Sequence, residues 1–161
     1  MTTPASDLTL SLVGERELRI SRTFRAPRPL VFQAMTQPEH LAHWWGPSSH
    51  TMASRVVDFR VGGRYRYVLR SPDGVEVGFG GEFREIAAPE RVVQTFEYEP
   101  VPGFQAVETL TWQAAGPGST RLTILTLYQS AEHRAGILGS GMEPTLADSY
   151  ARLDAYLTTL A

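Results

Sequence analysis

Apolar and polar residues alternate over most of the chain, which predicts a protein built largely of half-buried β-strands. The alternation runs through residues 16–24, 52–61, 64–70, 75–86, 91–98, 105–114 and 120–128. From residue 52 onward, short stretches rich in glycine and proline separate the segments, such as Gly62-Gly63 and the run 71–74. Because short turns join antiparallel neighbours, we expect one curved antiparallel sheet of about seven strands.

A different period appears near the end of the chain. Apolar residues recur there at spacings of four, three, four and three, at Leu146, Tyr150, Leu153, Leu157 and Leu160. This spacing predicts a long amphipathic helix with Pro144 in its first turn. Two short helices are expected at 30–35 and 38–45. The chain is therefore predicted to be α+β, with the last helix covering one face of the sheet and enclosing an apolar cavity.

With 161 residues, of which 42% are apolar, the chain is long enough for one globular domain and short for two. We assign 15–161 to a single domain and 1–14 to an N-terminal tail or strand extension. Residues 1–7 are small and polar and predict a frayed tail, whereas the leucines in 8–12 alternate with other residues. These leucines either lengthen the first strand or pair with a neighbouring subunit, which would make a homodimer.

Composition and motifs remove several classes of function. The absence of cysteine and lysine excludes disulfides, thiolate nucleophiles and Schiff-base chemistry, and the net charge of −2 argues against a nucleic-acid partner. No signal peptide or membrane-spanning run is present, so we expect a cytoplasmic protein. His40 and His43 share a helix face without a third ligand, so neither a metal nor another cofactor is expected. The glycines in 78–81 indicate close strand approach and those in 136–141 a loop, since neither joins a strand to a helix as nucleotide loops do.

The candidate binding residues lie on the apolar side of their strands or on the inward face of the last helix. They are Phe59, Tyr65, Tyr67, Phe79, Phe83, Phe96, Glu108, Leu110 and Trp112 in the strands, and Leu146, Tyr150 and Leu153 in the helix. An aromatic face of this kind is either a closed core or the wall of a ligand cavity. Buried tyrosine hydroxyls need hydrogen-bond partners and would orient a ligand that carries one or two polar groups.

Glu108 and two tryptophans each leave two interpretations open. Glu108 either points inward, where burial would raise its pKa, or lies at a strand end in solvent or beside an arginine. Trp44 and Trp45 come just before Gly46-Pro47 and point about 100° apart on a helix. Either one tryptophan caps the cavity mouth while the other packs against the sheet, or both simply anchor the short helices.

Four stretches of the chain together resemble one protein family. They read RTFRAPRPLVFQAMTQPEHLAHWWGP, DFRVGGRYRYVLRSPDG, GEFREIAAPERVVQT and GMEPTLADSYARLDAYL. Over roughly residues 18–157 the chain resembles bacterial homologues of the activator of heat-shock-protein ATPase, a family of the START-like (SRPBCC) superfamily. The resemblance implies a helix-grip fold with an apolar cavity that binds lipids, polyketides or other apolar molecules. Thr145-Leu146 stands where the family usually has a glycine and a tryptophan.

We therefore expect a protein that binds a small hydrophobic or amphipathic molecule, with the last helix and the region 44–49 as a gate. This function requires no catalytic residue. The alternative is a cyclase, dehydratase or hydrolase that acts inside the cavity through Glu108, the tyrosines and His43. A second alternative is a co-chaperone-like module that binds the heat-shock ATPase, which a free-standing single domain makes the weakest of the three.

Overall fold

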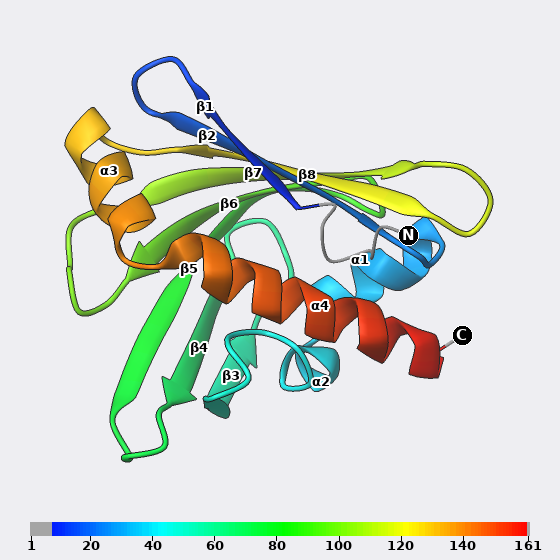
Figure 1. Cartoon of the computed structure of the whole chain (residues 1–161), viewed down its shortest axis with the longest axis horizontal. Coiled ribbons are helices and arrows are strands. Elements are labelled where there is room, and N and C mark those ends of the chain that lie inside the picture. The colour runs from blue at the N-terminus through cyan, green and yellow to red at the C-terminus, as the bar shows by residue number, and fades with distance from the viewer. Residues whose placement is uncertain (1–7, 161) are drawn as a thin grey trace.

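The computed structural model describes residues 8–160 as one eight-stranded antiparallel sheet with four helices (Figure 1). The strands are β1 (Thr9–Val13), β2 (Glu17–Phe24), β3 (Thr51–Val57), β4 (Arg64–Arg70), β5 (Glu76–Ala87), β6 (Arg91–Tyr98), β7 (Ala106–Ala114) and β8 (Thr120–Leu127). Their order across the sheet is β1-β2-β8-β7-β6-β5-β4-β3. The predicted α+β class with a curved antiparallel sheet is confirmed, and the sheet has one strand more than expected.

The additional strand is β1, which contains most of the alternating leucines near the N-terminus. Residues 9–13 pair with residues 17–21 of β2 across a turn at Gly14, whose φ is 57°. The leucines thus form a separate edge strand that pairs within the chain, with Leu10 packed against the core and Leu12 62% exposed. The tail expected at residues 1–7 lies outside the described residues.

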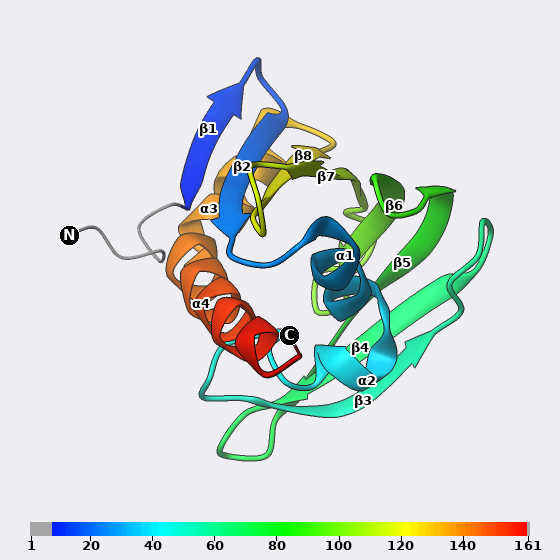
Figure 2. The same cartoon turned by 90° about the vertical axis from the view of Figure 1, so that its right-hand side faces the viewer.

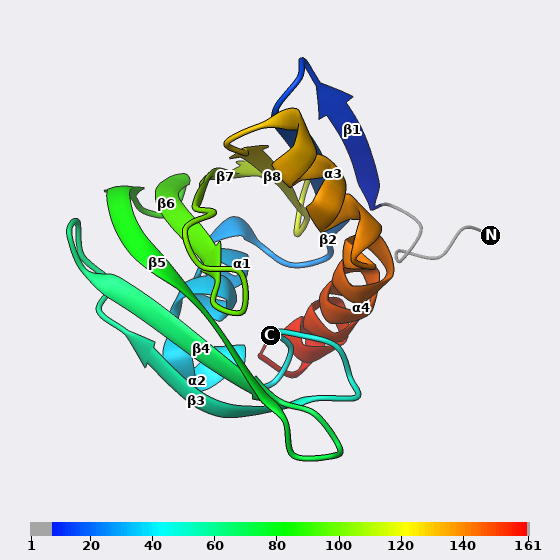
Figure 3. The ribbon, with the colours of Figure 1, turned by 90° about the vertical axis from the view of Figure 1, so that its left-hand side faces the viewer.

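The helices are α1 (Arg28–Thr36), α2 (Pro38–Leu41), α3 (Ala131–Gly139) and α4 (Met142–Leu160). The sheet curls around α4, which crosses its concave face (Figures 2 and 3). Along α4, α3 lies at one end and α1 at the other (Figure 1). We call these the α3 end and the α1 end of the interior. None of the helices in residues 8–160 is long and apolar enough to cross a membrane.

Two helix predictions were wrong. α2 ends at Leu41 instead of residue 45. The chain turns at Gly46, which has φ 93°, and Pro47 has no N–H with which to continue the helical hydrogen bonds. The expected loop at 136–141 is largely helical, since α3 runs to Gly139. The Ser130 side chain caps α3 by accepting a hydrogen bond from the His133 N–H at 3.0 Å. No residue of α3 is fully buried, so α3 lacks the apolar stripe that would have revealed it.

Two glycines allow the chain to pack closely around the interior. A Cβ at Gly81 would collide with the carbonyl oxygen of Thr95 on the neighbouring strand β6, which confirms the interpretation of this glycine run as close strand approach. A Cβ at Gly46 would lie 2.8 Å from Leu69 Cδ1. The loop before β3 can therefore press against the sheet only with glycine at this position.

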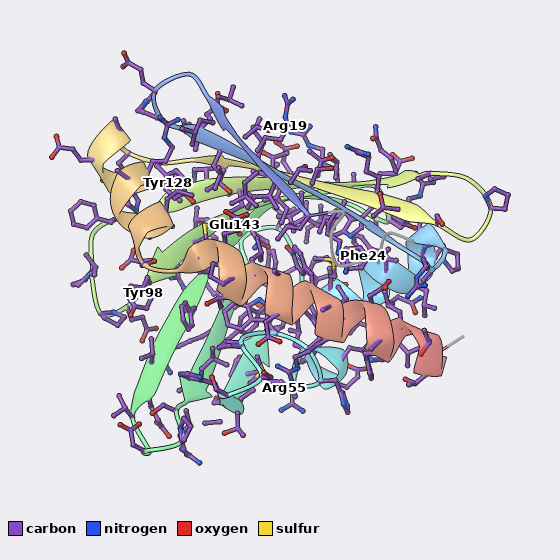
Figure 4. The ribbon with its side chains drawn as sticks, in the orientation of Figure 1. Arg19, Phe24, Arg55, Tyr98, Tyr128 and Glu143 are labelled. Atoms are coloured by element: carbon purple, nitrogen blue, oxygen red, sulfur yellow. The ribbon has the colours of Figure 1, made fainter. Side chains whose placement is uncertain are left out.

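A buried ion pair joins the sheet to the C-terminal half of α4. Asp154 lies 3.8 Å from the guanidinium of Arg22, a β2 residue that is 1% exposed and stands 4.7 Å from the ring centroid of Phe24. Figure 4 labels Phe24 near the α1 end. Asp154 also accepts hydrogen bonds from Arg25, from the backbone N–H at 3.2 Å and from Nη2 at 3.0 Å. These contacts fix where α4 crosses the concave face.

We predict that Asp154→Ala lowers the free energy of unfolding by about 3 kcal/mol or more, because Arg22 stays buried while its facing carboxylate is lost. The control is Asp58→Ala, which removes the exposed pair with Arg60 and should cost less than about 1 kcal/mol. Urea unfolding of both variants measures the difference. Equal costs for the two variants would contradict the role given to Asp154.

Candidate ligand-binding site

A row of three polar side chains crosses the floor of the interior. Gln94 on β6, Glu108 on β7 and Thr126 on β8 are direct neighbours in the sheet. Gln94 Nε2 donates a hydrogen bond to Glu108 Oε1 at 3.0 Å. Thr126 is 2% exposed, and its Oγ1 has no hydrogen-bond partner among the described residues. We call these three residues the polar row.

Glu108 is half-buried and lies on the same side of β7 as buried Leu110 and Trp112, the side that its parity indicated. Burial raises the pKa of its carboxyl from 4.5 to about 7, and the hydrogen bond from Gln94 opposes this rise in part. No ion pair to Glu108 is found within residues 8–160. The structure therefore gives Glu108 no arginine partner among the described residues and leaves its side chain half-buried, between the two expected environments.

Four tyrosines lie close enough to Glu108 for its charge to act on their hydroxyls. Burial first, and the Glu108 carboxylate second, raise the pKa of Tyr65, Tyr67, Tyr128 and Tyr150. The Tyr65 hydroxyl donates to the Thr95 carbonyl oxygen at 2.5 Å. The hydroxyls of Tyr67 and Tyr150 form no hydrogen bond within the described part of the chain. The polar row and two free hydroxyls thus face one region of the interior.

Half-buried aromatic residues lie beside this region. Trp45 packs edge-on against Tyr67, with ring centroids 4.9 Å apart, and against Phe79, at 5.1 Å. Phe79 also stacks on Phe96 at 6.0 Å and contacts Tyr98 at 5.4 Å. Figure 4 shows Tyr98 and Tyr128 toward the α3 end. Apolar surface that is not fully covered therefore gathers at this end of the interior.

The two tryptophans occupy different environments, although they lie in the turn after α2 and not on the helix from which this was predicted. Trp44 is buried, donates from Nε1 to the Ala34 carbonyl oxygen at 2.9 Å, and lies 6.1 Å from the Tyr150 ring. Trp44 anchors the loop before β3, whereas the Trp45 ring lies among the aromatic residues of the sheet. Of the two, Trp45 is the one that stays half-buried beside Tyr67 and Phe79.

The remaining predicted residues divide between the two ends. Phe59 contacts Phe83 at 5.1 Å and Phe32 at 6.0 Å, and Trp112 contacts Phe32 at 4.8 Å, all at the α1 end. Leu110 and Leu153 are core residues. Leu146 is half-buried on the first turns of α4 and packs against the core. The structure therefore does not bring Phe59 and Trp112 together with Glu108.

Sequence reasoning missed two members of the polar row and two apolar neighbours. Gln94 shares parity with Val92 and Phe96, the same signal that marked Glu108. Thr126 shares parity with Leu122 and Ile124, which marks it as inward too. Leu138 and Met142 also pack against the core beside Leu146, but they belong to the α3–α4 corner that was predicted as a loop.

The histidines do not form a site. His40 Nδ1 lies 2.6 Å from the Tyr156 hydroxyl, and the His43 ring stacks on Tyr156 at 4.5 Å. His43 is exposed and does not face Glu108. Within residues 8–160, no three histidine, aspartate or glutamate side chains come close enough together to hold a metal ion.

The sequence matches the family model described as Activator of Hsp90 ATPase homolog 1-like protein over residues 25–158. The chain belongs to this family. A search of curated proteins finds no significant match.

Solved bacterial structures share the fold of this family member. One from Rhodobacter sphaeroides superposes with a TM-score of 0.88 at 24% identity, covering 94% of this chain and 99% of the other. A Mycobacterium smegmatis protein gives 0.82 at 25%, covering 93% and 96%. A solution structure from Arthrobacter aurescens gives 0.82 at 23%, covering 94% and 91%. These likenesses show the START-like (SRPBCC) fold, which is consistent with ligand binding between sheet and helix.

Two surface hollows of this family member lie elsewhere. One of about 290 Å³ is lined by residues that include Phe32, Phe59 and Pro89. Another of about 200 Å³ borders Arg66 and Glu97. Neither is lined by α4, so an enclosed cavity beneath α4 stays a prediction.

We predict that Glu108 makes folding depend on pH. Below about pH 4.5 the carboxyl is protonated in both states, whereas at higher pH the unfolded chain releases a proton that the folded protein keeps until about pH 7. The contribution of Glu108 to the free energy of unfolding is therefore fully present below about pH 4.5. It is lost as pH rises through about 7, which lowers the free energy of unfolding by on the order of 3 kcal/mol.

Glu108→Gln should remove this loss, and the exposed Glu85→Gln should keep it. Urea unfolding of wild type and both variants, at about pH 4.5 and about pH 8, measures the change. The same pH dependence in wild type and Glu108→Gln would contradict the assignment.

Proposed function

We propose that this chain binds a small hydrophobic or amphipathic molecule between the concave face of the sheet and the first turns of α4. The observation that carries the proposal is the polar row beneath incompletely covered aromatic side chains at the α3 end. A buried hydroxyl or carboxyl without a partner costs free energy, and natural interiors rarely contain one unless water or a ligand satisfies it. Thr126 Oγ1 is such a group, and Glu108 stands directly beside it.

The attachment of α4 supports access from the α3 end. Ser149 Oγ donates to the Trp44 carbonyl oxygen at 2.9 Å and accepts from the Gly46 N–H at 3.2 Å, and Arg152 Nη1 donates to the Gly46 carbonyl oxygen at 3.0 Å. Asp148 accepts from the Ser48 N–H at 2.7 Å. These bonds hold the region 44–48, half of the expected gate, to α4 itself.

The first turns of α4 lack such bonds. Within the described residues, no side chain in 142–147 forms a hydrogen bond, and the contacts of this stretch with the core are made by half-buried Met142 and Leu146. Apolar contacts are not directional and can re-form around an entering molecule. We therefore place the opening between the first turns of α4 and the aromatic residues of β5 and β6.

A cavity-based enzyme is the second candidate, because a carboxyl with a pKa near 7 is suited to general acid or base chemistry. Of its expected residues, His43 lies away from Glu108, so Glu108 and the tyrosines alone would carry the reaction. Binding to the heat-shock ATPase, which the family description names, is tested by a pull-down with the purified chaperone.

We predict that Leu146→Trp weakens binding of a bulky apolar probe. The larger ring adds on the order of 60 Å³ at the proposed opening and should raise the melting temperature of the empty protein if it fills free space. The control is Leu160→Trp, at a half-buried position on the other end of the same helix. Calorimetry and thermal shift with a neutral naphthalene methyl ketone and with lipid and polyketide panels measure both effects.

The binding and stability of the two tryptophan variants distinguish support from contradiction. Weaker probe binding by Leu146→Trp, with Leu160→Trp unchanged, supports the proposed site. Absence of any thermal shift across the panels, or a destabilised Leu146→Trp with unchanged affinity, would overturn it.

A further inference from the structure

We propose that the molecule bound at this site carries an uncharged carbonyl or hydroxyl oxygen, and that Glu108 and Thr126 hold this oxygen from the floor of the interior. The inference rests on the proposed function and names the class of its ligand. The evidence is the chemistry of the side chains around the polar row. This evidence does not depend on the volume of the space beneath α4.

The hydroxyls around the polar row each bring one O–H donor that needs an acceptor, besides an oxygen that can itself accept. The Thr126 hydroxyl is buried without a partner, and the hydroxyls of Tyr67 and Tyr150 are also free within the described residues. A protonated Glu108 carboxyl adds a further O–H, while its Oε1 already accepts from Gln94. The O–H groups that β4, β7, β8 and α4 supply near Glu108 suit a ligand oxygen, which can accept two hydrogen bonds.

A ligand carboxylate does not fit this region, because no cation is available to pair with it. The nearest arginines that act on these tyrosines are Arg22 and Arg134. Arg22 faces Asp154 at 3.8 Å, and Arg134 Nη1 donates to the carbonyl oxygens of Gly14 at 3.0 Å and Glu17 at 2.9 Å. A carboxylate would have to be buried beside Glu108 without a counter-charge, which costs several kcal/mol.

A ligand ammonium fits less well than a neutral oxygen. It would require an ionised Glu108, and burial disfavours that form up to about pH 7. An ammonium group also brings donors alone, so it would use only the acceptor side of the Thr126 and tyrosine hydroxyls and leave their O–H donors without an acceptor. The ammonium compound is therefore a competing outcome of the experiment.

Near neutral pH, Glu108 is the group at the site whose charge changes. Tyr65 and Tyr67 from β4, Tyr128 after β8 and Tyr150 from α4 all have a raised pKa and stay neutral. On α3, burial lowers the pKa of His133, whose ring lies 5.0 Å from that of Tyr128. The arginines that act on these tyrosines are Arg22 on β2 and Arg134 on α3.

The experiment compares four naphthalene probes that differ in one substituent, namely a methyl ketone, a hydroxyl, a carboxylate and an aminomethyl group. Isothermal titration at about pH 6 should show the ketone and the alcohol binding about tenfold more tightly than the carboxylate and the amine. Affinity for the ketone should fall by about tenfold as pH rises from about 6 to about 8, because an ionised Glu108 cannot donate.

Two variants separate the polar row from the apolar surface. Glu108→Gln keeps a donor without the titration, so it should bind the ketone with no dependence on pH, while the exposed Glu85→Gln keeps the wild-type profile. Thr126→Val removes the orphan hydroxyl without changing its shape, so it should fold at least as stably as wild type and bind the ketone about threefold to tenfold more weakly.

The failures of the two proposals look different. If no probe binds, both the proposed function and this inference are overturned. If all four probes bind equally, or the carboxylate or amine binds most tightly, or Thr126→Val binds the ketone as well as wild type does, the inference is overturned while the binding function stands.

Discussion

The contact of Asp154 with two arginines sets the position of α4, and the remainder of the interior depends on that position. A single helix must cover a concave face formed by eight strands, and its polar attachments to the rest of the chain begin at Asp148 and continue toward its C-terminus. Because charged and backbone partners demand fixed geometry, this half of α4 cannot slide along the sheet. The first turns of the same helix are held by apolar contacts with the sheet.

This asymmetry divides the interior into two parts of different character. At the α1 end, Phe24, Phe32 and Trp112 close the core with aromatic contacts. At the α3 end, Phe79 and Phe96 keep accessible surface, and the floor carries the polar row. The same sheet therefore provides a packed core and a surface with unused hydrogen-bonding groups.

Buried Asp154 and half-buried Glu108 show how differently one interior can hold a carboxyl group. Asp154 has guanidinium partners and serves the fold. Glu108 has an amide donor, no ion pair within the described residues, and a raised pKa. A polar group that weakens its own fold is most often found at a functional site. Family membership establishes the fold, whereas the proposal of a bound ligand rests on these particular side chains.

Local patterns in the sequence were sufficient for the strands and the long helix, because alternation and helical spacing depend on neighbours along the chain. For Glu108 they left two environments open. They were insufficient for α3, whose exposed face carries no apolar stripe, and for the division of the aromatic residues between the two ends. Which residues meet across strands depends on register, and a bulge between Phe83 and Glu85 shifts it in β5. The sequence alone therefore determined that one face of the sheet would be aromatic and that Glu108 would share its parity. Only the tertiary structure decided that Gln94 and Thr126 would flank it and that Asp154 would take the arginines, since these contacts join segments distant in the chain.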